Sequence, residues 1–110
     1  MLSGEGERRE TRRQRSLLGA RFVSEHPSLT IGCTIRDLTE SGALIVFPPL
    51  VAVPSRGWLV DPRTGVAYDT VAAWHAGARR GVKFLGQLDV TKPQAGWLNH
   101  LHRLWLVGPR

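Results

Sequence analysis

Apolar residues fall in short runs separated by turn residues, and this rhythm constrains the fold more than any other feature of the sequence. In the clearest run, residues 29–36 (LTIGCTIR), apolar and polar side chains alternate. Successive side chains of a strand point to opposite faces, so this run predicts a half-buried strand with its four apolar residues on one face. Five more runs have the composition of strands: 17–24, 43–47, 57–60, 66–74 and 81–85.

Six strands are enough to close a small antiparallel β-barrel. Residues 61–65 (DPRTG) combine the Asp, Pro and Gly typical of tight turns, and they predict a hairpin between two of the strands. Closure removes the exposed strand edges that otherwise promote aggregation, so the pattern favours an all-β, six-stranded barrel over an open sheet.

The apolar spacing changes near the end of the chain from about two residues to about 3.6, which predicts a C-terminal α-helix over residues 91–107. Thr91 and Gln94 have the spacing of a capping box, and Gly108-Pro109 would end the helix. We expect the apolar stripe to pack on the barrel rather than on a partner protein. The stripe consists of Leu98, Leu101, Leu104 and Trp105.

Positive charge is concentrated at the N-terminus. The 110 residues include 15 Lys+Arg and 9 Asp+Glu, a net charge of +6, and the segment 8–15 holds five arginines and one acidic residue. Residues 1–15 contain almost no apolar side chains, so we expect a flexible arm that an anionic partner orders. The predicted organisation is a basic arm at 1–15, a barrel at 16–90 and a helix at 91–107.

Length and cysteine content exclude several classes of protein. A chain of 110 residues is too short for a multidomain enzyme. A lone cysteine, Cys33, excludes an intrachain disulfide and a Cys-rich zinc site. The start lacks the apolar core of a secretory signal, and no apolar run reaches the ~20 residues of a spanning helix. We therefore expect a cytoplasmic protein that does not insert into a membrane.

Two short motifs carry the candidate chemistry. The first is an Arg-x-x-x-Arg formed by Arg9 and Arg13, and Arg8 with Arg12 forms a second copy shifted by one residue. The planar guanidinium group of arginine binds phosphate oxygens or a guanine edge with two hydrogen bonds and also stacks on a purine. The spacing alone does not choose between the two registers.

The second motif, Asp-x-Thr-x-x-Gly, comprises Asp37, Thr39 and Gly42 and follows the alternating strand. The carboxylate can accept N–H donors of guanine, the hydroxyl can bind a phosphate, and the glycine allows close approach of a ligand or a positive φ. An alternative interpretation is a capped turn in which Asp37 and Thr39 bond their own backbone and Gly42 is left-handed.

Together with Trp74 at the end of a later strand and Gly81-Val-Lys-Phe84 in the next, these motifs resemble the PilZ domain family over about residues 8–85. The resemblance implies a six-stranded antiparallel β-barrel with a C-terminal helix. It also implies a bacterial, cytoplasmic receptor for cyclic di-GMP that signals to an unidentified downstream protein, with no cofactor besides this ligand.

The family's ligand-binding residues correspond here to Arg9, Arg13, Asp37, Thr39 and Gly42, with Arg8 and Arg12 as the alternative register. Threonine stands at position 39 where the family usually has serine, which keeps the hydroxyl and adds a methyl group. The other matched residues are expected in the barrel core: Trp74, Gly81, Val82 and Phe84.

Other functions have weaker support in the sequence. Asp and Ser residues show no catalytic spacing, and His100 and His102 lie two apart on the predicted helix, so we expect neither an enzyme nor a metal site. A barrel that binds RNA or single-stranded DNA is the main alternative. Such barrels display aromatic residues on an exposed strand face, and the sequence pattern predicts no such face here, so we do not expect nucleic acid as the partner. A PilZ-like adaptor that binds no ligand is the third possibility.

Overall fold

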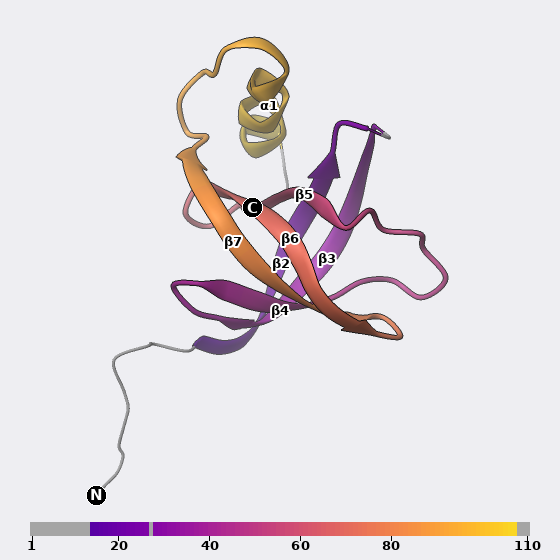
Figure 1. The fold of residues 1–110 in the computed structure, drawn as a ribbon. Helices are drawn as coiled ribbons and strands as arrows, with labels where there is room; N and C mark the ends of the chain where they lie inside the picture. Colours follow the sequence, from indigo (N-terminus) through magenta and orange to yellow (C-terminus); the bar gives the residue numbers. More distant parts are fainter. Residues whose placement is uncertain (1–13, 27, 108–110) are drawn as a thin grey trace, which may run out of the picture.

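Six antiparallel strands close into a barrel in the structure, a computed structural model that describes residues 14–26 and 28–107 (Figure 1). Their order around the barrel is β2-β3-β4-β7-β6-β5, with β5 paired to β2. The predicted fold class is confirmed. The strands are β2 (Gln14–Ser24), β3 (Leu29–Leu38), β4 (Gly42–Val46), β5 (Arg56–Asp61), β6 (Val66–Ala76) and β7 (Arg79–Asp89).

The first strand begins earlier than predicted. Gln14 and Arg15 belong to β2, where they pair with Leu38 and Asp37 of β3, so the strand includes the last two residues of the predicted arm. Strand pairing uses backbone groups, which polar residues supply as well as apolar ones, and apolar alternation cannot mark such a strand end. The rest of the predicted arm, 1–13, lies outside the described residues.

Alternating residues of the strands fill the barrel interior. Phe22, Ile35, Ile45 and Leu59 are fully buried there, and the ring of Phe22 meets that of Phe47 edge to face at 5.4 Å between centroids. The predicted alternation along β3 is confirmed, since Cys33 and Ile35 are buried while Thr30, Gly32 and Arg36 are exposed. The interior is therefore packed with side chains.

A second apolar cluster lies between the barrel and the helix α1 (Asn99–Val107), which occupies one end of the barrel in Figure 1. Val23, Val60 and Ala67 alternate with inward-pointing neighbours, so they face outward. Leu101 of α1 is fully buried against them. The expected packing of the helical stripe on the barrel is confirmed. Trp58 and Trp97 pack against the same cluster.

The helix begins later than predicted. A 3-10 turn, η1 (Gly96–Leu98), precedes α1, and residues 90–95 are not helical. Thr91 does not cap a helix, because its hydroxyl and backbone N–H both bond to the carboxylate of Asp89. The Gln94 side chain donates to the carbonyls of Asp89 and Lys92. Local side-chain hydrogen bonds thus hold this connection in a non-helical form.

No helix in the described part of the chain is long and apolar enough to cross a membrane.

Burial of Cys33 gives a testable pH dependence. Desolvation raises the pKa of its thiol from 9.0 to about 12. Between these values the unfolded chain loses the proton while the folded chain keeps it, so stability falls as pH rises above 9. From pH 8 to pH 10 the wild type should lose about 1 kcal/mol more stability than Cys33→Ala, as measured by urea unfolding. Parallel pH curves for the two proteins would contradict this assignment.

Candidate functional site

The Asp-x-Thr-x-x-Gly motif forms the tight turn that joins β3 to β4. The backbone N–H of Thr39 donates to the carbonyl of Gly42 at 2.9 Å. The Thr39 hydroxyl oxygen accepts from the backbone N–H groups of Ser41 at 3.3 Å and Gly42 at 3.2 Å. Thr39 is therefore part of a capped turn, as the alternative interpretation of the motif expects. Asp37 lies partly buried at the base of the turn.

Gly42 serves close packing between strands. Among the described residues, the glycines with a positive φ are Gly65, Gly77 and Gly96, so Gly42 does not have one. A Cβ at position 42 would instead lie under 3.0 Å from the carbonyl oxygen of Val82 on β7. The left-handed conformation suggested by the capped-turn interpretation is thus wrong. Glycine is required here because β4 and β7 approach each other directly beside the turn.

The turn borders an open groove of about 360 Å³ on the barrel surface. One wall comes from the turn and the start of β4. The other comes from β6 and β7, which are far from the turn in sequence and adjacent to it in the barrel through the pairing of Gly42 with Lys83. The main lining side chains and backbone segments belong to Asp37, Thr39, Ser41, Gly42, Trp74, Gly81 and Lys83.

Trp74 is not a core residue, contrary to the prediction, and is 49% exposed. A register shift between Ala72 and Trp74 interrupts the pairing of β6 with β7 and reverses the alternation that would point the indole inward. The indole lies over Gly81, where a Cβ would collide with it. Val82 belongs to the core and Phe84 packs against it, as expected, whereas Gly81 is buried on the outer face, beneath the indole.

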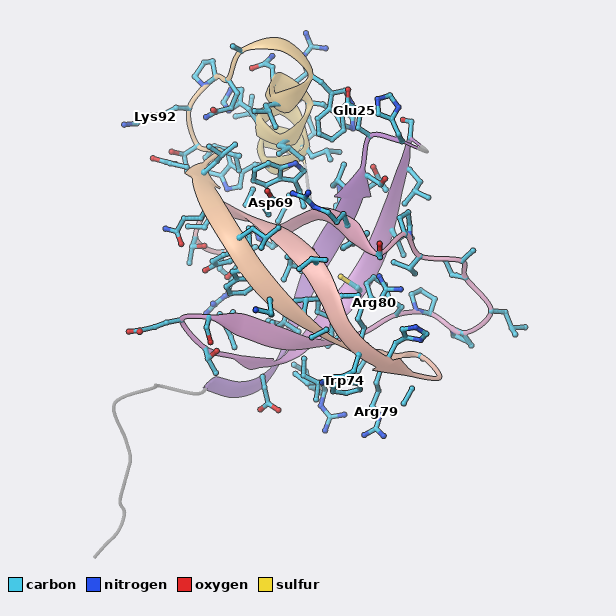
Figure 2. All side chains as sticks on the ribbon, viewed as in Figure 1. Glu25, Asp69, Trp74, Arg79, Arg80 and Lys92 are labelled. Carbon is cyan, nitrogen blue, oxygen red and sulfur yellow. The ribbon has the colours of Figure 1, made fainter. Side chains whose placement is uncertain are left out.

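The exposed indole of Trp74 adds an aromatic wall to the groove, which the sequence pattern did not predict. Exposed aromatic faces stack on bases, at about 1–3 kcal/mol for each base. A single sequence carries no signal that would reveal the outward turn of Trp74, since the register shift depends on how two strands pair. Figure 2 shows Trp74 and Arg79 at the same end of the barrel.

Basic side chains near the groove have two different roles. Lys83 and Arg79 are exposed and alternate along β7 with inward residues, so they share the outer face with Gly81. Two consecutive arginines, Arg79 and Arg80, predict a solvated turn, but this prediction is wrong for Arg80, which is buried. Its guanidinium donates to the carbonyls of Val53 and Pro54 and lies 5.4 Å from the Phe47 ring centroid. Burial lowers the pKa of Arg80.

The start of β2 lies next to the motif turn. Arg15 pairs with Asp37 and Gln14 with Leu38, the residue before Thr39, and Figure 1 shows the start of β2 beside the β3–β4 turn. The pairing is irregular on both strands, between Arg15 and Leu18 in β2 and between Ile35 and Asp37 in β3. Bulges are frequent near functional sites because they change the direction of neighbouring side chains.

The four candidate arginines, Arg8, Arg9, Arg12 and Arg13, lie outside the described residues. In the sequence Arg13 directly precedes Gln14, the first residue of β2, and Arg9 lies five positions before Gln14. Five residues of fully extended chain span at most about 18 Å.

Among residues 14–26 and 28–107, no three His, Cys, Asp or Glu side chains lie close enough to ligate a metal. His102 Nδ1 is 2.8 Å from the carbonyl oxygen of Val90, which fixes the imidazole between α1 and the end of β7. The groove at the turn offers charged groups, hydrogen-bonding groups and an aromatic face.

Comparison with known proteins adds no family assignment. No protein-family model matches the chain. No curated protein matches it either. The resemblance of the two motifs to the PilZ family therefore stays a prediction.

Proposed function

We propose that the chain is a cyclic di-GMP receptor that binds its ligand in the groove at the β3–β4 turn. The observation that carries this proposal is the pairing of Arg15 with Asp37. It puts the start of β2, which directly follows the arginine-rich segment in the sequence, beside the turn that holds the second motif, and we expect one compact ligand to contact both motifs. A small dianion carrying two guanines matches the guanidinium groups, the carboxylate and the aromatic wall of this site.

Each part of the groove has a distinct role in the proposal. Arg9 and Arg13 bind phosphate oxygens and the O6/N7 edge of guanine, which present acceptors to the guanidinium donors. Asp37 accepts N–H donors from the guanine Watson–Crick edge. Trp74 stacks on a base, and the exposed Lys83 adds positive charge. Thr39 contributes chiefly by holding the turn, since its hydroxyl accepts two backbone N–H bonds there.

Binding converts into a signal by ordering the arginine-rich segment. Ordering a segment costs conformational entropy, and charge-assisted hydrogen bonds of roughly 1.5–3 kcal/mol each offset that cost. The ordered segment and ligand then form a new surface for a downstream protein in the cytoplasm of a bacterium. Such a receptor performs no covalent chemistry and needs no cofactor.

Calorimetric titration with cyclic di-GMP tests the arginines. Arg9→Ala and Arg13→Ala should each weaken binding at least ten-fold, since each removes charge-assisted bonds to the ligand. Thermal unfolding should change little. Arg103→Ala, at an exposed position on α1, is the matched control and should bind like the wild type. Arg8→Ala and Arg12→Ala decide the register: a loss confined to these two would transfer the contacts to them, and unchanged affinity in all four would overturn the clamp.

Trp74→Ala separates this groove from other anion sites on the chain. The variant should lose about ten-fold in affinity, since it removes one stacking contact. Trp97→Phe, in the apolar cluster between barrel and helix, should bind like the wild type.

Titration with a short single-stranded RNA in increasing salt tests the alternative class of function, a nucleic-acid-binding barrel. Binding of RNA alone, with the steep salt dependence of counterion release, would replace this proposal with a nucleic-acid function. Binding of neither ligand would favour an adaptor that works by protein contact.

A further inference from the structure

A larger cavity, of about 780 Å³, lies on the outer face of the barrel beside helix α1. None of the residues that line it lines the groove at the motif turn. Its floor is formed by outward-facing positions of β2 and β3, and its wall includes the C-terminal half of α1. The lining residues that matter here are Gly19, Arg21, Gly32, Thr34, Leu104 and Trp105.

The two glycines in the floor have no local structural cause. Neither has a positive φ, and a Cβ at Gly19 or Gly32 would meet no atom within 4 Å. Glycine loses more conformational freedom on folding than alanine does, so two glycines within strands weaken this part of the barrel. Strand glycines without a packing reason often mark a place where a ligand approaches the backbone. Their missing side chains create the floor of the cavity.

The charge of the cavity is one-sided. Its lining residues in the described part of the chain include two arginines, Arg21 and Arg63, and no acidic residue. Arg63 is held 3.0 Å from the carboxylate of the buried Asp61. Arg21 is partly buried and forms no ion pair or side-chain hydrogen bond with any residue in 14–26 or 28–107. Its guanidinium is therefore available to an anion.

We propose that this cavity binds an elongated apolar molecule with one anionic head group, of the type of a medium-chain fatty carboxylate. Small-molecule sites occupy about 300–1,000 Å³ and have mostly apolar walls with a few polar groups that orient the ligand. Here Leu104, Trp105 and the glycine floor take the chain, and Arg21 takes the head group. Arg21 lies directly opposite Gly32 in the strand pairing, so the charge sits at the edge of that floor. This site is independent of the proposed cyclic di-GMP groove.

Calorimetry with dodecanoate, below its micelle concentration, tests the apolar part of the site. The wild type should bind one dodecanoate per chain, and Gly32→Val should lose at least ten-fold in affinity because the valine fills the floor. Valine is favourable in a strand, and a Cβ at position 32 meets no atom within 4 Å, so the variant should fold. Gly86→Val on β7 is the matched control, as an exposed strand glycine with equally open space outside the cavity. Equal binding by Gly32→Val, or no binding by the wild type, would overturn the proposal.

Arg21→Gln tests the charged part. It should lower the affinity for dodecanoate about ten-fold and leave the weaker binding of uncharged dodecanol unchanged, whereas Arg103→Gln should bind both like the wild type. Equal affinity of the wild type for dodecanoate and dodecanol would overturn the head-group assignment.

Binding to phosphatidylglycerol vesicles distinguishes a free ligand from a lipid surface. One result would overturn the site: no binding of free dodecanoate by the wild type, together with vesicle binding that Gly32→Val leaves unchanged. That result would mean that the basic surface attracts anionic lipid in general.

Discussion

Gly42→Ala is expected to destabilise the barrel by about 2–3 kcal/mol and to weaken cyclic di-GMP binding more than ten-fold. The added Cβ would collide with the carbonyl oxygen of Val82, a backbone atom that cannot move without displacing β7. Forcing extra atoms into a packed site costs typically 1–3 kcal/mol. Separating β4 from β7 would also disturb the groove, whose walls come from Gly42 on one strand and Lys83 opposite it on the other.

The matched control is Gly86→Ala, which adds the same methyl group to a strand where no atom lies within 4 Å. It should change stability by less than about 1 kcal/mol and leave binding intact. Urea unfolding and calorimetry at low temperature measure both quantities. A domain of this kind unfolds with about 5–15 kcal/mol, so Gly42→Ala remains folded for the titration. Equal stability of the two variants would show that β4 can move away from β7 at little cost.

Gly65→Ala should cost about 3 kcal/mol and loosen helix α1. Gly65 has a φ of +73° in the hairpin between β5 and β6, where a side chain is strained by roughly 1–2 kcal/mol. A Cβ there would also collide with the Thr91 methyl group and lie 3.3 Å from Trp105 Nε1. The backbone cannot shift freely, since the Gly65 N–H donates to Asp61 and its carbonyl accepts from Val90.

Gly77→Ala separates the strain of the turn from the clash with the helix. Gly77 has a similar φ of +63°, in the hairpin between β6 and β7, but a Cβ there meets no atom within 4 Å. This variant should lose only about 1–2 kcal/mol, the cost of the backbone conformation. Tryptophan fluorescence should change in Gly65→Ala alone, because Trp105 packs between barrel and helix. Equal losses in both variants would mean that α1 accommodates the methyl group.

The barrel was predictable because alternation along a strand directly encodes which side chains meet the core. The run 29–36 shows this, and β3 buries Cys33 and Ile35 as its pattern predicts. The hairpin at 61–65 was also predictable, since Gly65 takes the left-handed conformation that such a turn requires. The helical stripe was located correctly, but the helix start was not. Hydrogen bonds that Thr91 donates to the Asp89 carboxylate compete with a helix cap at that place.

The candidate site was predictable only in part. The motif 37–42 forms a turn as the residues indicate, but the strand-to-strand contact of Gly42 with Val82 has no local signature. Trp74 was wrongly expected in the core, because a single register shift in the pairing of β6 with β7 turns its side chain outward. Arg80 was expected in solvent, yet the carbonyls of Val53 and Pro54 accept its donors.

The sequence by itself determined the strands, their buried faces, the helical stripe and the excess of positive charge, because each depends on neighbours close along the chain. Only the tertiary structure decided which distant strands meet. It paired Arg15 with Asp37, set Trp74 and Lys83 beside the motif turn, and formed a glycine-floored cavity under α1. The physical reason is that strand pairing is a backbone interaction whose register depends on bulges and closure of the whole barrel, which no local pattern records.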